Sequence, residues 1–412
     1  MAILDISTYA AMLKKFYNPG KVQNMVYKKN PWFAMLPKSS KMPGTTLEVP
    51  VQYEDSQNRS ATFSDAASGA TTLQSVVFSV TPSRDYGLAT IDGELIRAAE
   101  SNEGAFMRAG TNAIGSVING LTRSWALKLW REGYGSLASA TTAASGAITV
   151  SGSTFTVANL GDIVHFSKGQ RLVFADSVSG DALRSATPVN VTAVNRVTGV
   201  VTCAETMATP GAINGDFVFG LGDRQDSGAP ARICVTGFLG WVPASAPTSA
   251  SFNGVDRTPD VTRLGGLRQA SAGQAIEEAI IDATQLAGRE GWNLSHLFMS
   301  PIEYGNILKT LSSKVEIDIK TDMPGISFSG VKVWGTGGAI TCVSDPNIPA
   351  DLIAGVTMDT WLLRTRGEPI GVLDEDGLSM RAHATLDAYT MRYGGYGNLT
   401  CNAPGANINI AR

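Results

Sequence analysis

The sequence predicts an α+β protein in which a long β-hairpin leads into one long helix, and a separate all-β unit interrupts a mixed body. Residues 47–53 and 76–80 alternate apolar and polar side chains, as strands do. Residues 103–131 place apolar side chains at steps of three and four, as one face of a helix does. Residues 144–222 contain short β-type runs separated by Gly, Asp and Asn.

The bulk properties are those of a globular chain with low charge. The length of 412 residues is enough for two or three domains. The composition is 43% hydrophobic and 17% charged. No apolar run approaches the roughly 20 residues that span a bilayer, so no membrane association is expected. The start, Met1 to Ser7, lacks a basic stretch followed by an apolar one. We therefore predict no signal peptide and synthesis in the cytoplasm.

Residues 1–43 are interpreted as an N-terminal arm. Residues 1–41 contain seven lysines and one acid, Asp5, so their net charge is +6 and that of the rest is −9. A basic arm on an acidic body can contact a polyanion or an acidic patch of a neighbouring subunit, or be a solvated extension. The arm has no arginine, which disfavours readout of bases. The predicted contact residues are Lys14, Lys15, Lys21, Lys28 and Lys29.

Residues 44–90 are predicted to form an extended β-hairpin. Strands of about ten residues would reach roughly 30 Å, and an isolated hairpin is at best marginally stable in water. A ribbon of this length needs a neighbouring subunit to lie on. We therefore assign an intersubunit contact to the alternating apolar residues of its two strands, Leu47, Val49, Val51, Tyr53, Val76, Phe78 and Val80.

Three further segments complete the predicted organisation. Residues 91–143 hold the long helix and begin a peripheral domain. Four glycines in this helix, each costing roughly 1 kcal/mol against Ala, suggest that a sheet or another backbone approaches closely. Residues 144–222 are predicted to be an inserted small β-barrel, and residues 223–412 a mixed α/β body. In that body, Ser300-Pro301 with Glu303 is a typical helix start.

No catalytic constellation is present in the sequence. The three histidines, His165, His296 and His383, are isolated and lack metal-ligand spacing. The four cysteines show no CxxC pattern, so we expect buried thiols and no zinc site. No nucleophile elbow or phosphate loop is found. We predict no catalytic, cofactor-binding or metal-binding residues, no cofactor, and no enzyme activity.

Taken in chain order, the lysine-bearing arm, the long hairpin, the long helix and the mixed α/β body resemble a tailed-bacteriophage major capsid protein of the Hong Kong 97-type fold. The hairpin from Leu47 to Val80 resembles the extended loop of that family, and Glu103 to Arg131 resembles its spine helix. Met299 to Tyr304, Tyr396 to Leu399 and Pro404 to Asn407 are also similar to segments of the family. The inserted barrel departs from the minimal fold.

The resemblance implies a structural protein of the virion. Copies would form hexamers and pentamers of an icosahedral head that encloses double-stranded DNA without reading its sequence. A scaffolding protein, a portal and a decoration protein are the implied partners. No lysine lies between Lys41 and Lys128, so the hairpin crosslink of some members is not expected. Because the arm begins close to Met1, we expect a separate scaffolding protein or none.

Two alternatives remain open from the sequence. One is an encapsulin-like compartment, a shell of the same fold around a protein cargo. The other is a different phage structural protein or a β-rich adhesive protein, which would be a monomer or trimer.

Overall fold

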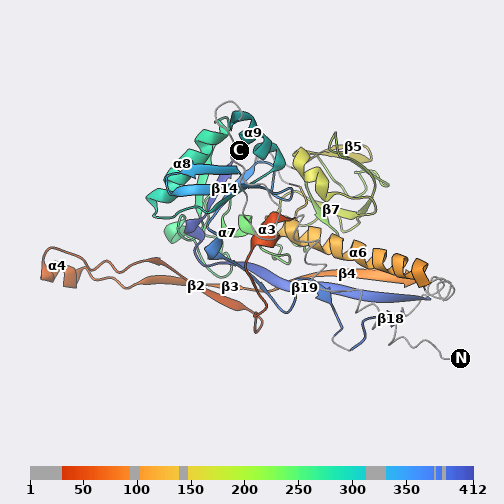
Figure 1. Ribbon diagram of the computed structural model, residues 1–412, viewed down its shortest axis with the longest axis horizontal. Helices are drawn as coiled ribbons and strands as arrows, with labels where there is room; N and C mark the ends of the chain where they lie inside the picture. The colour runs from red at the N-terminus through yellow and green to blue at the C-terminus, as the bar shows by residue number, and fades with distance from the viewer. Residues whose placement is uncertain (1–29, 93–102, 139–146, 312–330, 375–376, 383–386) are drawn as a thin grey trace.

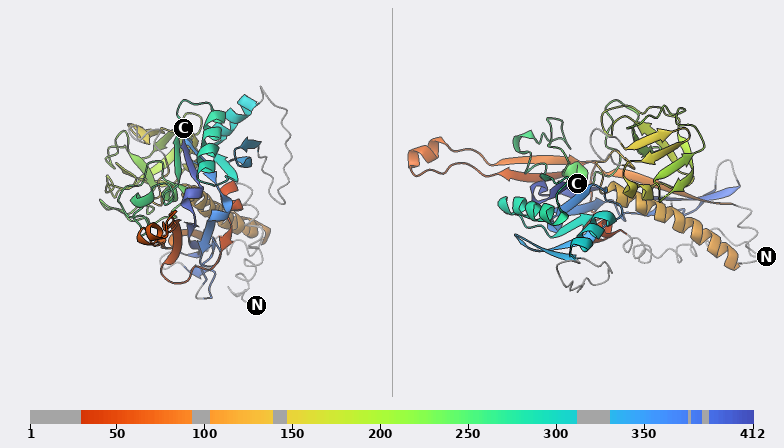
Figure 2. Two further views of the ribbon diagram at one scale, coloured as in Figure 1. Left: turned by 90° about the vertical axis from the view of Figure 1, so that its left-hand side faces the viewer. Right: turned by 90° about the horizontal axis from the view of Figure 1, so that it is seen from above.

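The computed structural model describes residues 30–92, 103–138, 147–311, 331–374, 377–382 and 387–412. A thin hairpin and a longer arm built of strands and a helix extend from opposite sides of a body (Figure 1). A rounded β unit lies beside the body, on the side of the long helix (Figure 2). In the described residues, no helix is long and apolar enough to cross a membrane.

The predicted hairpin is present. Strands β2 (Leu47–Glu54) and β3 (Gln74–Val80) pair antiparallel, with Leu47 opposite Val80 and Val49 opposite Phe78. A short helix, α4 (Phe63–Ser68), lies at the far end of the hairpin (Figure 1). The alternation in the sequence therefore predicted the strands and their pairing.

The opposite arm is a strand pair covered by the long helix. Strand β4 (Ser83–Asp92) pairs antiparallel with β19 (Ala388–Cys401) along its whole length. Helix α6 (Glu103–Lys128) lies against this pair. Gly87 permits the contact, because a Cβ there would lie 2.6 Å from Cγ1 of Val117. Residues 83–90, assigned above to the hairpin, belong to this sheet. It also contains the short strands β1 (Lys38–Ser39), β16 (Trp361–Thr365), β17 (Gly371–Val372) and β18 (Arg381–Ala382).

The β unit has six strands in the order β10-β7-β8-β9-β6-β5 and a core of its own. Residues 163–166, expected as a strand, instead belong mostly to a 3₁₀ turn, η2 (Leu160–His165). Among the described residues, no pairing joins β5 to β10, so closure into a barrel stays a prediction. Its strands are β5 (Ile148–Ser151), β6 (Thr154–Val157), β7 (Arg171–Ala175), β8 (Val189–Asn195), β9 (Val200–Cys203) and β10 (Phe217–Gly220).

The body is a mixed sheet with two helices against it. Its strand order is β11-β20-β15-β12-β14-β13, and helices α8 (Ile276–Arg289) and α9 (Pro301–Leu311) pack on it. The cap expected at Ser300 is seen, since its hydroxyl accepts a hydrogen bond from the Glu303 N–H at 3.3 Å. The strands are β11 (Leu267–Ala270), β12 (His296–Met299), β13 (Val331–Gly335), β14 (Gly338–Ser344), β15 (Leu352–Val356) and β20 (Ile408–Ala411).

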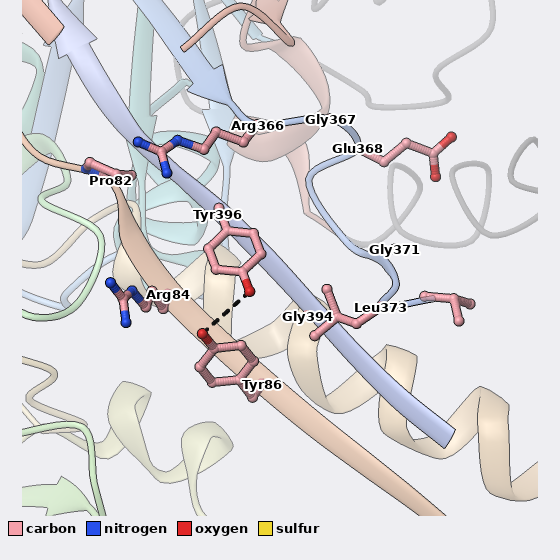
Figure 3. A pocket seen from close by; sticks show the side chains of 11 residues that line it. Pro82, Arg84, Tyr86, Arg366, Gly367, Glu368, Gly371, Leu373, Gly394 and Tyr396 are labelled. Atoms are coloured by element: carbon pink, nitrogen blue, oxygen red, sulfur yellow. Dashed lines mark hydrogen bonds between the residues drawn. The ribbon is translucent and has the colours of Figure 1, made fainter. Parts of the chain in front are cut away.

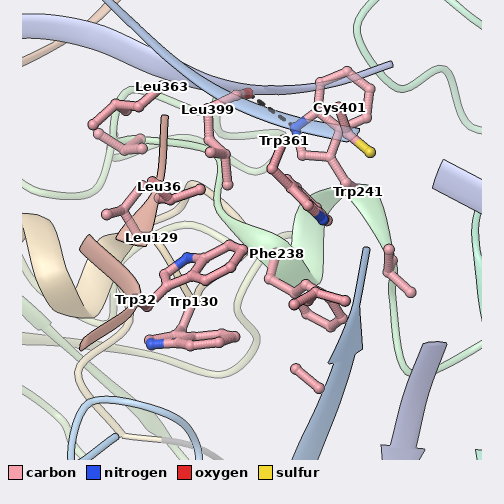
Figure 4. Close-up of a cluster of buried hydrophobic side chains, with 14 of the residues drawn as sticks. Trp32, Leu36, Leu129, Trp130, Phe238, Trp241, Trp361, Leu363, Leu399 and Cys401 are labelled. Atoms are coloured by element: carbon pink, nitrogen blue, oxygen red, sulfur yellow. Dashed lines mark hydrogen bonds between the residues drawn. The ribbon is translucent and has the colours of Figure 1, made fainter. Parts of the chain in front are cut away.

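An aromatic core joins the body to the root of the N-terminal arm (Figure 4). Helix α3 (Pro31–Met35) buries Trp32, which stacks on Trp130 at the end of α6. The short helix α7 (Phe238–Trp241) closes the same core from another side. Asn30-Pro31 and Leu36-Pro37 favour extended chain in the sequence, because a residue that precedes proline is biased away from the helical region. The structure shows a helical turn there because Pro31 occupies its first position and the apolar side chains that follow are buried.

Candidate assembly surfaces

The apolar face of the hairpin lies on the chain's own body. Val49, Val51, Phe78 and Val80 are buried in the core, where Phe78 meets Trp241 with ring centroids 5.1 Å apart. Leu47, Tyr53 and Val76 are half-buried against the same core. The intersubunit role of these residues stays a prediction, and a neighbour could reach the four buried ones only if the hairpin left the body.

The outer face and the distal part of the hairpin are open instead. Val77, on the outer face, is 45% exposed, and Phe63 at the start of α4 is 90% exposed. From residue 55 to residue 75 every residue except Ala66 is exposed. The last contact of the ribbon with the body is at Glu54, whose carboxylate pairs with Arg263 at 3.0 Å. Beyond that ion pair, the rest of the described chain leaves the hairpin uncovered.

A second open surface is the face of the β4–β19 pair that points away from α6. Alternating residues of β4, namely Arg84, Tyr86 and Leu88, are exposed there, and Leu88 lies opposite Arg392 of β19. We call this surface the β4–β19 face. It carries two arginines and two large apolar or aromatic side chains.

One end of the β4–β19 face is hollowed into a groove of about 710 Å³ (Figure 3). The hydroxyls of Tyr86 and Tyr396 lie 3.4 Å apart, and their rings meet edge to face. Arg366 closes one end of the groove and donates from Nε to the Met42 carbonyl at 3.3 Å. The groove is therefore rigid at that end, whereas Arg84 is exposed.

The basic residues predicted in the arm, Lys14, Lys15, Lys21, Lys28 and Lys29, lie outside the described residues. Lys38 is described and has a structural role. Its Nζ donates to the Phe33 carbonyl at 2.8 Å and lies over the Phe33 ring, and burial lowers its pKa to about 8.

The described histidines and cysteines are buried or half-buried. Burial lowers the pKa of His165 to about 3 and also lowers that of His296, so both imidazoles are neutral at pH 7. The four cysteines are buried thiols, as expected. In the described part of the chain, no three metal-ligating side chains gather. His383 lies outside that part, and the absence of enzyme activity stays a prediction.

No protein-family model matches the sequence, and no curated protein matches it. In three dimensions the chain is similar to the cyanophage A-1(L) capsid asymmetric unit, with a TM-score of 0.49, 10% identity, and coverage of 95% of this chain and 92% of that chain. It is similar to the capsid of the native GTA particle, with a TM-score of 0.47, 11% identity, and coverage of 93% and 89%.

It is also similar to the holo-SrpI encapsulin complex from Synechococcus elongatus PCC 7942, with a TM-score of 0.43, 7% identity, and coverage of 100% and 96%. Phage capsids and an encapsulin are both among these similar structures.

The sequence reasoning missed the residues that make up the open surfaces. Phe63 and Val77 belong to the predicted hairpin, but the assignment followed its other face. Arg84, Tyr86 and Leu88 alternate with Gly87 and Ala89, a period-two signal that marked a strand with one open face. The sequence contains that signal, but residues 83–90 were assigned to the hairpin.

Proposed function

We propose that this protein is a shell subunit, and that copies of it assemble into the closed icosahedral capsid of a tailed phage around double-stranded DNA. The observation that carries the proposal is the exposure of the hairpin from residue 55 to residue 75, beyond its last contact at Glu54. A two-stranded ribbon of this kind is marginally stable in water, so an ordered hairpin requires a surface outside its own chain.

A neighbouring copy is the partner that best fits this requirement. The hairpin and the β4–β19 face are different surfaces on opposite sides of the body (Figure 1). A contact between them is heterologous, since each copy uses one surface for one neighbour and the other surface for the next. Such contacts generate rings when the rotation closes, and rings that share further contacts build shells.

Charge and shape support the β4–β19 face as the receiving surface. The exposed acids of the hairpin are Glu48, Asp55 and Asp65, against one exposed arginine, Arg59. The receiving face offers Arg84 and Arg392, with Leu88 and Tyr86 for the apolar side chains of the hairpin. Opposite charges on the two surfaces would favour this pairing of the hairpin with the β4–β19 face and speed the encounter between copies.

The first test is electron microscopy with light scattering on the full chain expressed alone and then with its scaffolding and portal candidates. We expect uniform shells with wild-type protein. Phe63→Ser and Arg84→Glu should give soluble, folded protein that forms few or no shells. Val197→Ser is the matched control for Phe63→Ser, because Val197 is 84% exposed on the β unit. High salt should weaken the contact, since the charges involved are exposed.

Three outcomes would change the proposal. A wild-type chain that stays monomeric or trimeric under every condition would contradict a shell and favour an adhesive or other structural role. Normal shells from both variants would agree with a shell subunit but contradict the contact between the hairpin and the β4–β19 face. Shells that contain a protein and no nucleic acid would identify an encapsulin-like compartment.

A further inference from the structure

A second hollow lies where the C-terminal turns of α6 meet the β unit, away from both assembly surfaces. It has a volume of about 370 Å³. Its wall is rich in cations and hydrogen-bond donors and contains one carboxylate. The residues around it include Gly120, Arg123, Lys128, His165, Lys168 and Asp223.

The one carboxylate on this wall, Asp223, is paired with Lys128, which it shares with Asp85. Lys128 Nζ lies 2.9 Å from Oδ1 of Asp223 and 3.1 Å from Oδ2 of Asp85. Two cations of the wall are therefore left for a ligand. Arg123 is exposed and uses Nη2 on the Val164 carbonyl. Lys168 is exposed and has no ion pair or hydrogen bond within the described chain.

His165 supplies the second, independent observation. Its side chain is only 5% exposed, yet its Nε2 has no hydrogen-bond partner among the described residues. The nearest acid, Asp162, lies 3.9 Å away, which is too far for a hydrogen bond. A buried polar atom without a partner is costly, by about 1–3 kcal/mol. His165 thus places a buried polar group without a hydrogen-bond partner in the wall of this pocket.

The flank of α6 at the pocket is bare. A Cβ placed on Gly120 would meet no atom within 4 Å, and the same holds for Gly115 further along the helix. The sequence analysis attributed these glycines to the close approach of a sheet or another backbone. No part of the described chain makes that approach at either position. The absence of a side chain at Gly120 therefore leaves room for a group that comes from outside the chain.

We propose that this pocket binds an oxyanion, specifically a phosphate group, held by Arg123 and Lys168 next to the imidazole of His165. Arginine and lysine are the side chains that bind phosphate, and hydrogen bonds to a charged group are stronger than neutral ones. The phosphate could be free in solution or part of a nucleic-acid backbone. The proposal does not depend on shell formation, since all the residues named belong to one chain.

The experiment measures binding by the full chain in two arms. Inorganic phosphate is titrated by calorimetry, and a short DNA duplex is titrated by fluorescence anisotropy. Gly120→Gln fills the pocket from a helix position that accepts a side chain, and Gly115→Gln is the matched control on the same helix. We expect Gly120→Gln and Lys168→Glu each to weaken binding about tenfold or more, and Gly115→Gln to leave it unchanged.

The imidazole of His165 gives a readout that a structural defect would not mimic. Burial holds the pKa of His165 at about 3, and a bound anion should raise it in a titration followed by NMR. Binding in the phosphate arm identifies a small-anion site, and binding in the DNA arm alone identifies backbone contact. If neither phosphate nor DNA binds, or if Gly120→Gln and Gly115→Gln bind alike, the proposal is wrong.

Discussion

The backbone N–H of Trp32 and the indole Nε1 of Trp130 donate to the same oxygen, Oδ2 of Asp345, each at 3.3 Å. The two rings stack with centroids 5.0 Å apart. Asp345 is fully buried, and burial raises its pKa while the donors around it oppose that rise. One carboxylate thus ties the root of the N-terminal arm, the end of α6 and the body together, so the root of the arm is part of the core.

Trp32→Ala is therefore expected to cost about 3–5 kcal/mol in the free energy of unfolding. It removes a fully buried ring that contacts Trp130, Phe298 and Trp361. Trp334→Ala is the matched control, because Trp334 is 78% exposed and its loss should change stability by less than about 0.5 kcal/mol. Urea unfolding of both variants measures the difference. Equal midpoints would show that the arm root is not part of the cooperative core.

Neighbouring residues of β3 test which face of the hairpin lies on the body. Phe78→Ala should destabilise the chain by about 3–5 kcal/mol, because it opens a cavity against Trp241 and Phe252. Val77→Ala should have little effect on unfolding, since Val77 points to the open face. An aspartate at residue 78 should unfold the hairpin root, whereas an aspartate at residue 77 should only impair assembly. Unfolding and particle yield, measured on all four variants, distinguish the two faces.

Local patterns predicted the elements well and the role of each face poorly. The alternation in residues 47–53 and 76–80 is visible in sequence because strand side chains alternate with a period of two. Which face meets the body depends on Trp241 and Phe252, far along the chain, so no local pattern contains it. The same limit applies to the 3₁₀ turn at residues 160–165. Its apolar residues look like a strand, but buried Asp162 pairs with Arg131 of the chain after α6 at 2.9 Å.

The seam between the β unit and the body should make stability depend on pH. Burial raises the pKa of Asp351 to about 6, with a further rise from Asp162 and an opposing effect of Arg131. Asn159 of the β unit donates to Asp351 at 3.4 Å. The folded-state pKa is raised, so Asp351 stabilises the fold in its protonated form. Its contribution to the free energy of unfolding is fully present below its unfolded pKa of about 4 and is lost as the pH rises through about 6.

Asp351→Asn should remove this dependence. Relative to wild type, the variant should gain stability at about pH 7 and show no gain at about pH 4. The gain should stay below about 3 kcal/mol, because Asp351 is partly exposed. Urea midpoints of both proteins across this range measure it. A difference between the proteins that is the same at both pH values would contradict the raised pKa.

Lys128 joins α6 to two other segments, and its removal gives the last prediction. Burial alone would lower its pKa, but Asp223 and Asp85 raise it above the ordinary value, so the ammonium is charged across the neutral range. Lys128→Met keeps the apolar stem and leaves two carboxylates without a counter-charge. The expected cost is about 3–5 kcal/mol at neutral pH. In the variant Asp223 loses the Lys128 charge that opposes the rise of its pKa by burial, so stability should recover as the pH falls and this carboxyl group becomes protonated.

The double variant Lys128→Met with Asp223→Asn provides the control for this mechanism. It removes one of the uncompensated charges, so it should be more stable than the single variant at neutral pH and depend less on pH. Thermal unfolding at about pH 5 and about pH 7 compares the three proteins. If the single variant loses as much stability at the lower pH as at the higher one, the loss comes from packing. The charges of Lys128, Asp223 and Asp85 would then not be what holds α6, β4 and the chain after β10 together.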